Sequence, residues 1–394
     1  MSGAKSLASV LTDLNHRKTT LLDKLGVHQG ALYENVSYVP ATRSFQHDFS
    51  LSYNPLGPSK AVVDALRQKV LSVSQYPDYS YTKMRESIAA YNAVQPENVV
   101  IGDGICGLMK NFIHGVLSEG DEYISSACSF FFPEITAHIS GAAVHRIPNA
   151  ENFAVNYEGM LSAINPRTKM IYLCSPASAS SMRLNLEELA DFVNRACRKS
   201  RNLIIIIDEA YFEFEDQSIA GLITSCPQLI VLRTFSKAFA LPGLRVGYAL
   251  GDAHTIADIS RLIPTMTVTS LAEVGVVASL NHVEDMLDSV DWIKKKRQSM
   301  ATKLTQLGFQ VLPSVTDYLV AKIPSQYRAS DQLIASLNDK GINIASGCDI
   351  QGLTDQYVRI CIRPNSMNKV LIMALREVVS LPQQQQAAPI QQTI

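Results

Sequence analysis

The middle of the chain alternates between short apolar runs and amphipathic helical patterns. The most apolar run, at 203–207, is one leucine and four isoleucines without a polar residue, which is typical of a strand covered by helices on both faces. Apolar runs of this kind lie at 122–126, 144–147, 169–174, 203–208, 229–234 and 246–250. Helical patterns separate them at 107–116, 132–139, 186–198 and 256–261. This order predicts an α/β fold with a large, doubly covered, mostly parallel sheet.

The two ends of the chain have a different pattern. After about residue 283, a long charged helical pattern is followed by short strands and helices, which predict a smaller α+β domain. Its expected elements lie at 286–307, 309–311, 318–323, 330–340, 357–362 and 366–379. Before the alternating region, residues 48–53 are expected to form a strand and 59–72 a helix, separated by a Pro- and Gly-rich turn.

These patterns divide the chain into four segments. An N-terminal arm at 1–47, with a helical pattern around 11–25, is expected to join the small domain. The large domain is expected at 48–283 and the small C-terminal domain at 284–382. The Gln-rich tail at 383–394 is expected to be disordered, because it is polar and low in complexity.

Composition and charge exclude several classes of protein. The 394 residues are 47% hydrophobic and 18% charged, which is enough apolar material for a large core. Lys and Arg number 35 and Asp and Glu 36, so no basic excess favours nucleic acid. The longest aliphatic run is far shorter than the roughly 20 residues of a membrane span, and the first 20 residues contain no apolar signal segment. We therefore expect a cytoplasmic protein.

The cysteines and histidines do not indicate a metal site. The seven cysteines are scattered and never form a C-x-x-C pair, so we expect them to be reduced thiols. The eight histidines show neither H-x-H nor H-E-x-x-H spacing. No dedicated metal site is predicted.

One lysine stands in a setting that suits covalent chemistry. Lys237 follows the predicted strand at 229–234, next to the hydroxyls of Thr234 and Ser236 and eight positions before Arg245. An amine can form a Schiff base with a carbonyl cofactor, while hydroxyls and a guanidinium hold a phosphate. The alternative, from these residues alone, is a solvated lysine at the end of a strand.

A buried carboxylate changes the balance between these two interpretations. Asp208 ends the most apolar strand, where a carboxylate is costly without a cationic partner. A protonated pyridine nitrogen would be such a partner. The D-E-A-Y element at 208–211 resembles that of fold-type I enzymes that use pyridoxal 5'-phosphate (PLP). In that family the Asp holds the pyridinium, and the tyrosine, here Tyr211, lies next to O3′ of the cofactor.

Further motifs extend the resemblance over about residues 46–380. Together with D-E-A-Y, they are similar to the motifs of histidinol-phosphate aminotransferase and of its sister, threonine-phosphate decarboxylase. They are N-P-L-G-P-S at 54–59, Q-Y-P-D at 75–78, G-D-G at 102–104 and S-K-x7-R at 236–245. The resemblance implies a PLP enzyme that acts at Cα of a small L-amino acid, with Lys237 as the Schiff-base residue and the group that moves the Cα proton.

The resemblance also implies roles for residues of the cofactor site. Gly104, Ile105 and Cys106 open a helix whose free N–H groups suit the cofactor phosphate, with Thr234, Ser236 and Arg245. Phe130 corresponds to the aromatic residue that stacks on the pyridine ring, although at least one phenylalanine of 130–132 is expected in the core.

Other matched residues concern the substrate and a second subunit. Tyr76 corresponds to the tyrosine that reaches the cofactor phosphate of the neighbouring subunit, which implies a homodimer. Arg359 corresponds to the arginine that grips the substrate α-carboxylate, the alternative being an arginine on a solvent-exposed strand face. Asn54, in the first motif, is expected among the substrate-binding residues.

Two positions depart from the family pattern. Ser178 stands where the family has an asparagine that hydrogen-bonds O3′, and a hydroxyl offers no amide donor. Ala345 stands where the enzymes acting on phosphorylated substrates carry an arginine, and Arg363 is either its replacement or an exposed charge. Acidic residues at Glu34, Asp48 and 213–216 near the expected mouth, with Tyr53, favour a cationic substrate side chain.

Two reactions are therefore expected as alternatives. The number of matching motifs favours an aminotransferase of the histidinol-phosphate type. The departures at Ser178 and Ala345 favour a lyase or cyclase that eliminates and cyclises a hydroxylated, arginine-like amino acid in specialised metabolism, resembling capreomycidine synthase.

Overall fold

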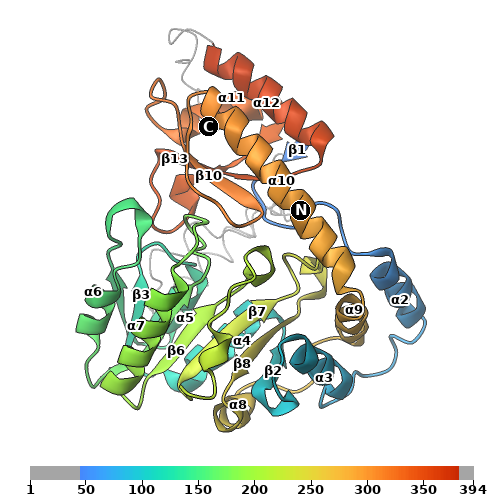
Figure 1. Cartoon of the computed structure of the whole chain (residues 1–394), viewed down its shortest axis with the longest axis vertical. Coiled ribbons are helices and arrows are strands. Elements are labelled where there is room, and N and C mark those ends of the chain that lie inside the picture. The colour runs from blue at the N-terminus through green and yellow to red at the C-terminus, as the bar shows by residue number, and fades with distance from the viewer. Residues whose placement is uncertain (1–44, 381–394) are drawn as a thin grey trace, which may run out of the picture.

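A seven-stranded sheet forms the centre of the larger part of the molecule. Figure 1 shows the protein as a computed structural model, which describes residues 45–380. The strand order is β2-β8-β7-β6-β5-β3-β4, in which β7, β6, β5, β3 and β4 are parallel neighbours and β8 is antiparallel to β7 and β2. The strands are β2 (Val99–Gly102), β3 (Glu122–Ser126), β4 (Ala143–Ile147), β5 (Thr168–Cys174), β6 (Ile204–Asp208), β7 (Leu229–Thr234) and β8 (Gly247–Gly251). The predicted α/β fold with a mostly parallel sheet is confirmed.

Both faces of this sheet are covered by helices, as the all-apolar strand β6 predicts. Ile206 packs in one core cluster with residues of α4 (Gly104–Val116), α5 (Phe132–Ile139) and α8 (Ala253–Ser260). Ile205 and Ile207 pack on the opposite face, in the cluster that includes α6 (Tyr157–Ala163) and α7 (Leu186–Lys199). Successive strand residues point to opposite faces, so a strand buried on both sides needs apolar residues throughout.

A four-stranded antiparallel sheet, in the order β12-β13-β10-β9, lies in the smaller, C-terminal part. Its strands are β9 (Gln310–Val311), β10 (Tyr318–Lys322), β12 (Ala345–Ser346) and β13 (Tyr357–Cys361). The accompanying helices are α10 (Val283–Gln306), α11 (Ser330–Asn338) and α12 (Asn365–Ser380). In Figure 1 the long helix α10 runs from the helices beside the large sheet up to this smaller part.

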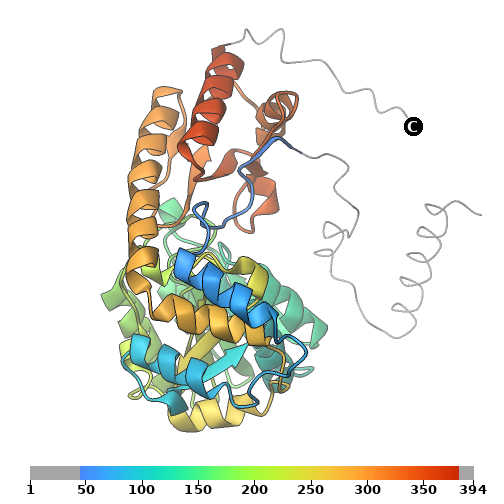
Figure 2. The same ribbon diagram turned by 90° about the vertical axis from the view of Figure 1, so that its right-hand side faces the viewer.

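The first described residues are tied to the smaller part. Strand β1 (His47–Asp48) pairs in parallel with β11 (Ile342–Asn343), and Figure 2 shows this blue segment beside the orange and red elements. The chain then enters α2 (Lys60–Val70), which packs against α9 (Ser270–Leu280). The predicted domain boundaries stay a proposal. Most of the predicted arm, its helical pattern at 11–25 and the tail at 383–394 lie outside the described residues.

Some predicted elements differ from the structure. The strand expected at 48–53 is wrong beyond Asp48, because the following backbone turns away and offers its carbonyl oxygens to two arginines, Arg359 and Arg363. The sequence pattern did not predict four further elements, which are α3 (Thr82–Tyr91), α6, α9 and the strand β2. Helix α9 lacks a clear polar face, so the usual helical alternation is absent from its sequence.

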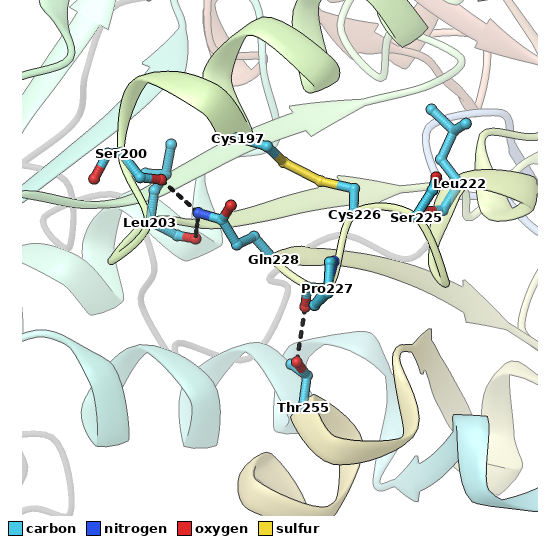
Figure 3. The surroundings of a disulfide bond; sticks show 9 residues. All are labelled: Cys197, Ser200, Leu203, Leu222, Ser225, Cys226, Pro227, Gln228 and Thr255. Carbon is cyan, nitrogen blue, oxygen red and sulfur yellow. Dashed lines mark hydrogen bonds between the residues drawn. A yellow bond between two sulfur atoms is a disulfide. The ribbon is translucent and has the colours of Figure 1, made fainter.

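Two cysteines correct the expectation of reduced thiols. Cys197, near the end of α7, and Cys226, just before β7, form a disulfide with their Cα atoms 6.8 Å apart (Figure 3). The end of α7 and the segment before β7 are neighbours because they lead into the adjacent parallel strands β6 and β7. The Gln228 side chain joins the two segments by donating to the carbonyl oxygens of Ser200 and Leu203 at 2.6 and 2.9 Å. The free cysteines are Cys106, Cys128, Cys174, Cys348 and Cys361.

Candidate active site

Asp208 and Lys237 meet at the carboxyl edge of the large sheet. Asp208 is the last residue of β6, and Lys237 follows the end of the neighbouring strand β7. Carboxyl ends of adjacent parallel strands lie at one edge, where α/β proteins bind their ligands. The Lys237 amine donates to the main-chain oxygen of Ser52 at 3.0 Å and to its Oγ at 2.9 Å, and it lies 5.3 Å from the ring centroid of Tyr211.

The carboxylate of Asp208 is buried and is held by uncharged donors. Its Oδ2 accepts from the Tyr172 hydroxyl at 2.7 Å, and its Oδ1 accepts from the Ala210 N–H at 3.0 Å. Burial raises the pKa of Asp208 to about 6, although these two hydrogen bonds act in the opposite direction. A protonated ring nitrogen beside Asp208 would supply the missing positive charge, so this site fits the pyridine end of PLP.

The amine of Lys237 is in an environment that favours its neutral form. Burial is the main cause that lowers the pKa of Lys237, and the positive charge of Arg359 lowers it further. The carboxylates of Asp317 and Asp208 oppose this effect. A lysine with a lowered pKa has a larger nucleophilic fraction at neutral pH, as attack on a carbonyl carbon requires.

The predicted phosphate residues converge at the start of α4. Gly104 has φ +84°, and a Cβ atom there would lie 2.9 Å from Nη2 of Arg245. The guanidinium therefore packs directly against the glycine. Gly247 lies against the Ile105 N–H and pairs in register with Thr234. The Thr234 hydroxyl is 3.0 Å from that of Ser236.

This arrangement offers N–H groups, hydroxyls and a cation to one anion. Cys106 lies close enough to Arg245 and Lys237 for their positive charges to act on its pKa. Burial, the largest cause, raises this pKa, and the two charges lower it. The N-terminus of a helix of 13 residues carries free N–H groups and the positive end of its dipole. The geometry therefore fits the phosphate of PLP.

Arg359 reaches the same site from the smaller part of the molecule. It lies on β13, and its Nη2 donates to the Ser50 oxygen at 2.8 Å. Its Nε is buried and finds no hydrogen-bond partner within residues 45–380. The alternative of an arginine on a solvent-exposed strand face is wrong, because the residue is half-buried and its guanidinium lies close enough to Lys237 and Tyr211 for their charges to interact.

Phe130 and Ser178 lie near the end of β5. The Phe130 main chain and the Ser178 side chain both act on the pKa of Cys174, which pairs in register with Asp208 on the neighbouring strand. The Ser178 main-chain oxygen accepts from the Tyr318 hydroxyl at 2.5 Å. In the 130–132 triplet, Phe130 and Phe132 pack partly against the core while Phe131 is 36% exposed, which agrees with the expected mixed role.

Two further predicted residues, Tyr76 and Asn54, have other surroundings than expected. The Tyr76 side chain is 80% exposed. Asn54 is buried, and its amide nitrogen donates to the Ala238 oxygen and to the Ser289 hydroxyl, both at 2.8 Å. Both N–H groups of that amide are thus used within the protein, so we revise its expected role from substrate binding to holding the segment that follows Lys237.

The charged residues expected to select the substrate are engaged internally. Arg363 is fully buried and donates to the oxygens of Asp48, Leu51 and Ile362, so it is neither an exposed charge nor a free anion ligand. Glu213 is buried and Glu215 pairs with Arg183. The acidic mouth inferred from 213–216 is therefore wrong for Glu213 and Glu215, whose side chains are buried, while Asp216 is exposed. Glu34 lies outside the described residues.

Three residues of the site were missed by sequence analysis. Tyr172 on β5 binds Asp208, and Ser52 and Asp317 lie beside Lys237. Only Asp317 carried a local signal, as a charged residue that directly precedes an apolar strand. Its contact with Ser52 joins segments 265 residues apart, which no local pattern encodes.

Comparison with known proteins agrees with this site. The sequence profile of the family "Aminotransferase class I and II" matches residues 46–375. The chain belongs to this family. The histidinol-phosphate aminotransferase of Methanosphaera stadtmanae is 28% identical over 329 residues, which are 83% of this chain and 88% of that protein. The aromatic amino acid aminotransferase of Rhodococcus erythropolis is 31% identical over 287 residues, or 72% and 79% of the two chains.

Solved structures of this fold are also similar. Histidinol-phosphate aminotransferase from Sinorhizobium meliloti, solved in complex with PLP, superposes with a TM-score of 0.80 at 22% identity and covers 89% of this chain and 97% of its own. The enzyme from Clostridium acetobutylicum gives 0.78 at 26% identity, with 84% and 99% covered. The family member described here has the fold-type I architecture and is a PLP-dependent enzyme of the aminotransferase type.

Proposed function

We propose that this aminotransferase transfers the amino group of an L-amino acid with a free α-carboxylate and no phosphate. The observation that carries this proposal is the pairing of Arg359 with Ala345. These residues are register partners on β13 and β12, so a methyl group stands beside the arginine of the site, whose buried Nε has no hydrogen-bond partner within residues 45–380. A planar guanidinium binds a carboxylate through two parallel hydrogen bonds, and a second cation for a phosphate is missing at position 345.

Each residue of the site receives a defined task in this proposal. When bound, PLP withdraws electrons from the bonds at Cα of the amino acid. Lys237 carries the cofactor and, once released, moves the proton at Cα. Asp208 keeps the ring nitrogen protonated, and Arg359 fixes the α-carboxylate, which orients Cα toward Lys237.

The cofactor is held by residues from several elements. Gly104, Ile105 and Cys106 at the start of α4 bind the phosphate with Thr234, Ser236 and Arg245. Phe130 packs against the ring, and Ser178 and Tyr211 lie at the O3′ side. Support comes from their convergence around Asp208 and Lys237.

We further propose a homodimer that completes the site. Tyr76 lies in an exposed apolar stretch, and a partner subunit that covers it would remove this surface from water. The exposed side chains of this stretch are Val70, Leu71, Val73, Tyr76 and Tyr79.

No helix within residues 45–380 is long and apolar enough to span a bilayer. A cytoplasmic location remains a proposal. Because the cytosol keeps most thiols reduced, the oxidation state of the Cys197–Cys226 pair in fresh cell extract tests it.

Chemical trapping tests the central assignment. The protein is loaded with PLP, reduced with borohydride and digested, and the peptides are analysed by mass spectrometry. We expect the pyridoxyl tag on Lys237 and its loss in Lys237→Ala, which should still bind some PLP through Ser236 and Arg245. A tag on another lysine, or a protein that binds no PLP, would refute the proposal.

Substrate profiling tests the amino-acid class. Unphosphorylated amino acids should convert the bound cofactor to its amine form without a keto acid, and a 2-oxo acid should restore it. Histidinol phosphate should react poorly because it offers a phosphate where Ala345 supplies no cation. Rapid, keto-acid-dependent turnover of histidinol phosphate would contradict this choice of substrate class.

Ser178 supports a second candidate, a lyase or cyclase that acts on a hydroxylated, arginine-like amino acid. A serine in place of the family asparagine lacks an amide donor at O3′, and this contact tunes the later steps of transamination. For this candidate the product keeps its nitrogen, no keto acid is needed, and solvent deuterium enters at Cα. Accumulation of the amine form of the cofactor with every reactive amino acid would exclude it.

A further inference from the structure

One buried hydroxyl joins three functional groups of the site. The Oγ of Ser52 lies 2.9 Å from the Lys237 amine and 2.8 Å from the Tyr211 hydroxyl. It also lies 2.9 and 3.0 Å from the two carboxylate oxygens of Asp317. The main-chain oxygen of Ser52 accepts a second hydrogen bond from Lys237.

A count of protons fixes the direction of each hydrogen bond. A serine hydroxyl has one proton and two lone pairs. The Asp317 carboxylate can only accept, so the Ser52 proton goes to Asp317. Lys237 and Tyr211 must then be the donors to the two lone pairs, so the proton and both lone pairs of this hydroxyl are used in hydrogen bonds. If Asp317 lost its charge, the Ser52 proton would be free to turn toward Tyr211, and the acceptor facing Lys237 would no longer be fixed.

Within the described residues, the Asp317 side chain has no hydrogen-bonded partner other than Ser52 to explain its burial. It is 1% exposed, directly before β10, and within residues 45–380 the Ser52 hydroxyl is the one donor to its carboxylate. Its charge nevertheless reaches Lys237, Arg359 and Arg297, since it is among the causes that raise the pKa of each. A buried carboxylate with a single neutral donor is costly, so its charge must be compensated by these neighbours.

We infer that Asp317 is a positioning residue for Lys237 that acts through the Ser52 hydroxyl. By accepting the only proton of that hydroxyl, Asp317 turns both lone pairs toward Lys237 and Tyr211. This holds the amine at the sheet edge beside Asp208 and places a negative charge one hydroxyl away from it. The inference rests on the proposed function only for the role of Lys237.

The surroundings of Lys237 give the expected direction of change. Burial and Arg359 favour the neutral amine, whereas the carboxylates favour the ammonium form. The titratable and charged groups that face Lys237 are Cys106, Asp208, Tyr211, Asp317, Arg359 and Cys361. Removal of the Asp317 charge should therefore lower the pKa of Lys237.

The pH dependence of Lys237 reactivity in the cofactor-free full chain tests the inference. Trace acetylation with acetic anhydride is measured between pH 6 and 11, and the Lys237 peptide is quantified by mass spectrometry. Asp317→Asn keeps the shape but removes the charge, and it should lower the Lys237 midpoint by about one pH unit or more. Glu215→Gln is the matched control, because Glu215 is a carboxylate that pairs with Arg183 and has no contact with Ser52.

Variants of the bridging residue separate positioning from charge alone. Ser52→Ala should also lower the midpoint, Ser52→Thr should restore it, and Asp317→Asn should shift it by less than half as much in the Ser52→Ala background. Equal shifts in both backgrounds would overturn the role of the bridge. Should Asp317→Asn fail to fold, an unchanged midpoint in Ser52→Ala would by itself overturn the inference. Failure of borohydride tagging would instead refute the role of Lys237, so the two failures are distinguishable.

Discussion

Asp208 should destabilise the folded protein until the cofactor binds. Its pKa rises from an ordinary 3.8 to about 6 through burial, which at 1.36 kcal/mol per unit corresponds to about 3 kcal/mol. Because folding raises this pKa, the penalty is absent below about pH 3.8, grows between about pH 3.8 and 6, and is constant above. The amide of Asp208→Asn can accept from the Ala210 N–H through its oxygen and donate to the Tyr172 hydroxyl oxygen, in reverse of the wild-type hydrogen bond, without a buried charge. The cofactor-free variant should therefore be about 3 kcal/mol more stable than the wild type at pH 8.

Urea unfolding of the cofactor-free proteins, at one protein concentration and at several pH values, measures this difference. The stability gain of Asp208→Asn should shrink as the pH falls from 7 to 4.5. PLP should then reverse the order at pH 8, because its ring nitrogen pairs with Asp208 but not with an amide. A stability difference that does not change with pH, or equal stabilisation of both proteins by PLP, would refute the reasoning.

Three further predictions concern the subunit contact, the substrate and the disulfide. Tyr76→Phe should weaken PLP binding while circular dichroism and light scattering show a folded dimer, and a fully active monomer would contradict it. Arg359→Lys should raise the KM for amino acids by about 10- to 100-fold, since a point charge replaces a bidentate fork; an unchanged KM would rule out a grip on the carboxylate. Cys226→Ser should lower the free energy of unfolding by about 2–4 kcal/mol under non-reducing conditions. Exposed, free Cys348→Ser is the control, and equal stability of both variants would show that the disulfide does not form.

The sequence alone determined the large sheet and the central pair of the site. Strand β6 is apolar at every position before its last, as suits a strand covered by helices on both faces, and its final Asp208 stands out against that background. Lys237 follows β7 by a fixed local spacing, so the position of both residues at one sheet edge follows from the order of parallel strands. Such features are local or repeat with the period of a helix or strand, so they can be predicted from the sequence.

Tertiary structure decided the features that depend on distant partners. Arg363 is buried because backbone carbonyls of the segment near Asp48 turn toward it, and the same turn ends the expected strand at 48–53. Cys197 and Cys226 meet because the helix and the turn that hold them lead into the adjacent strands β6 and β7. Ser52 and Asp317 come from segments 265 residues apart. A side chain's charge or thiol is visible in the sequence, but its partner is chosen by the packing of the whole chain.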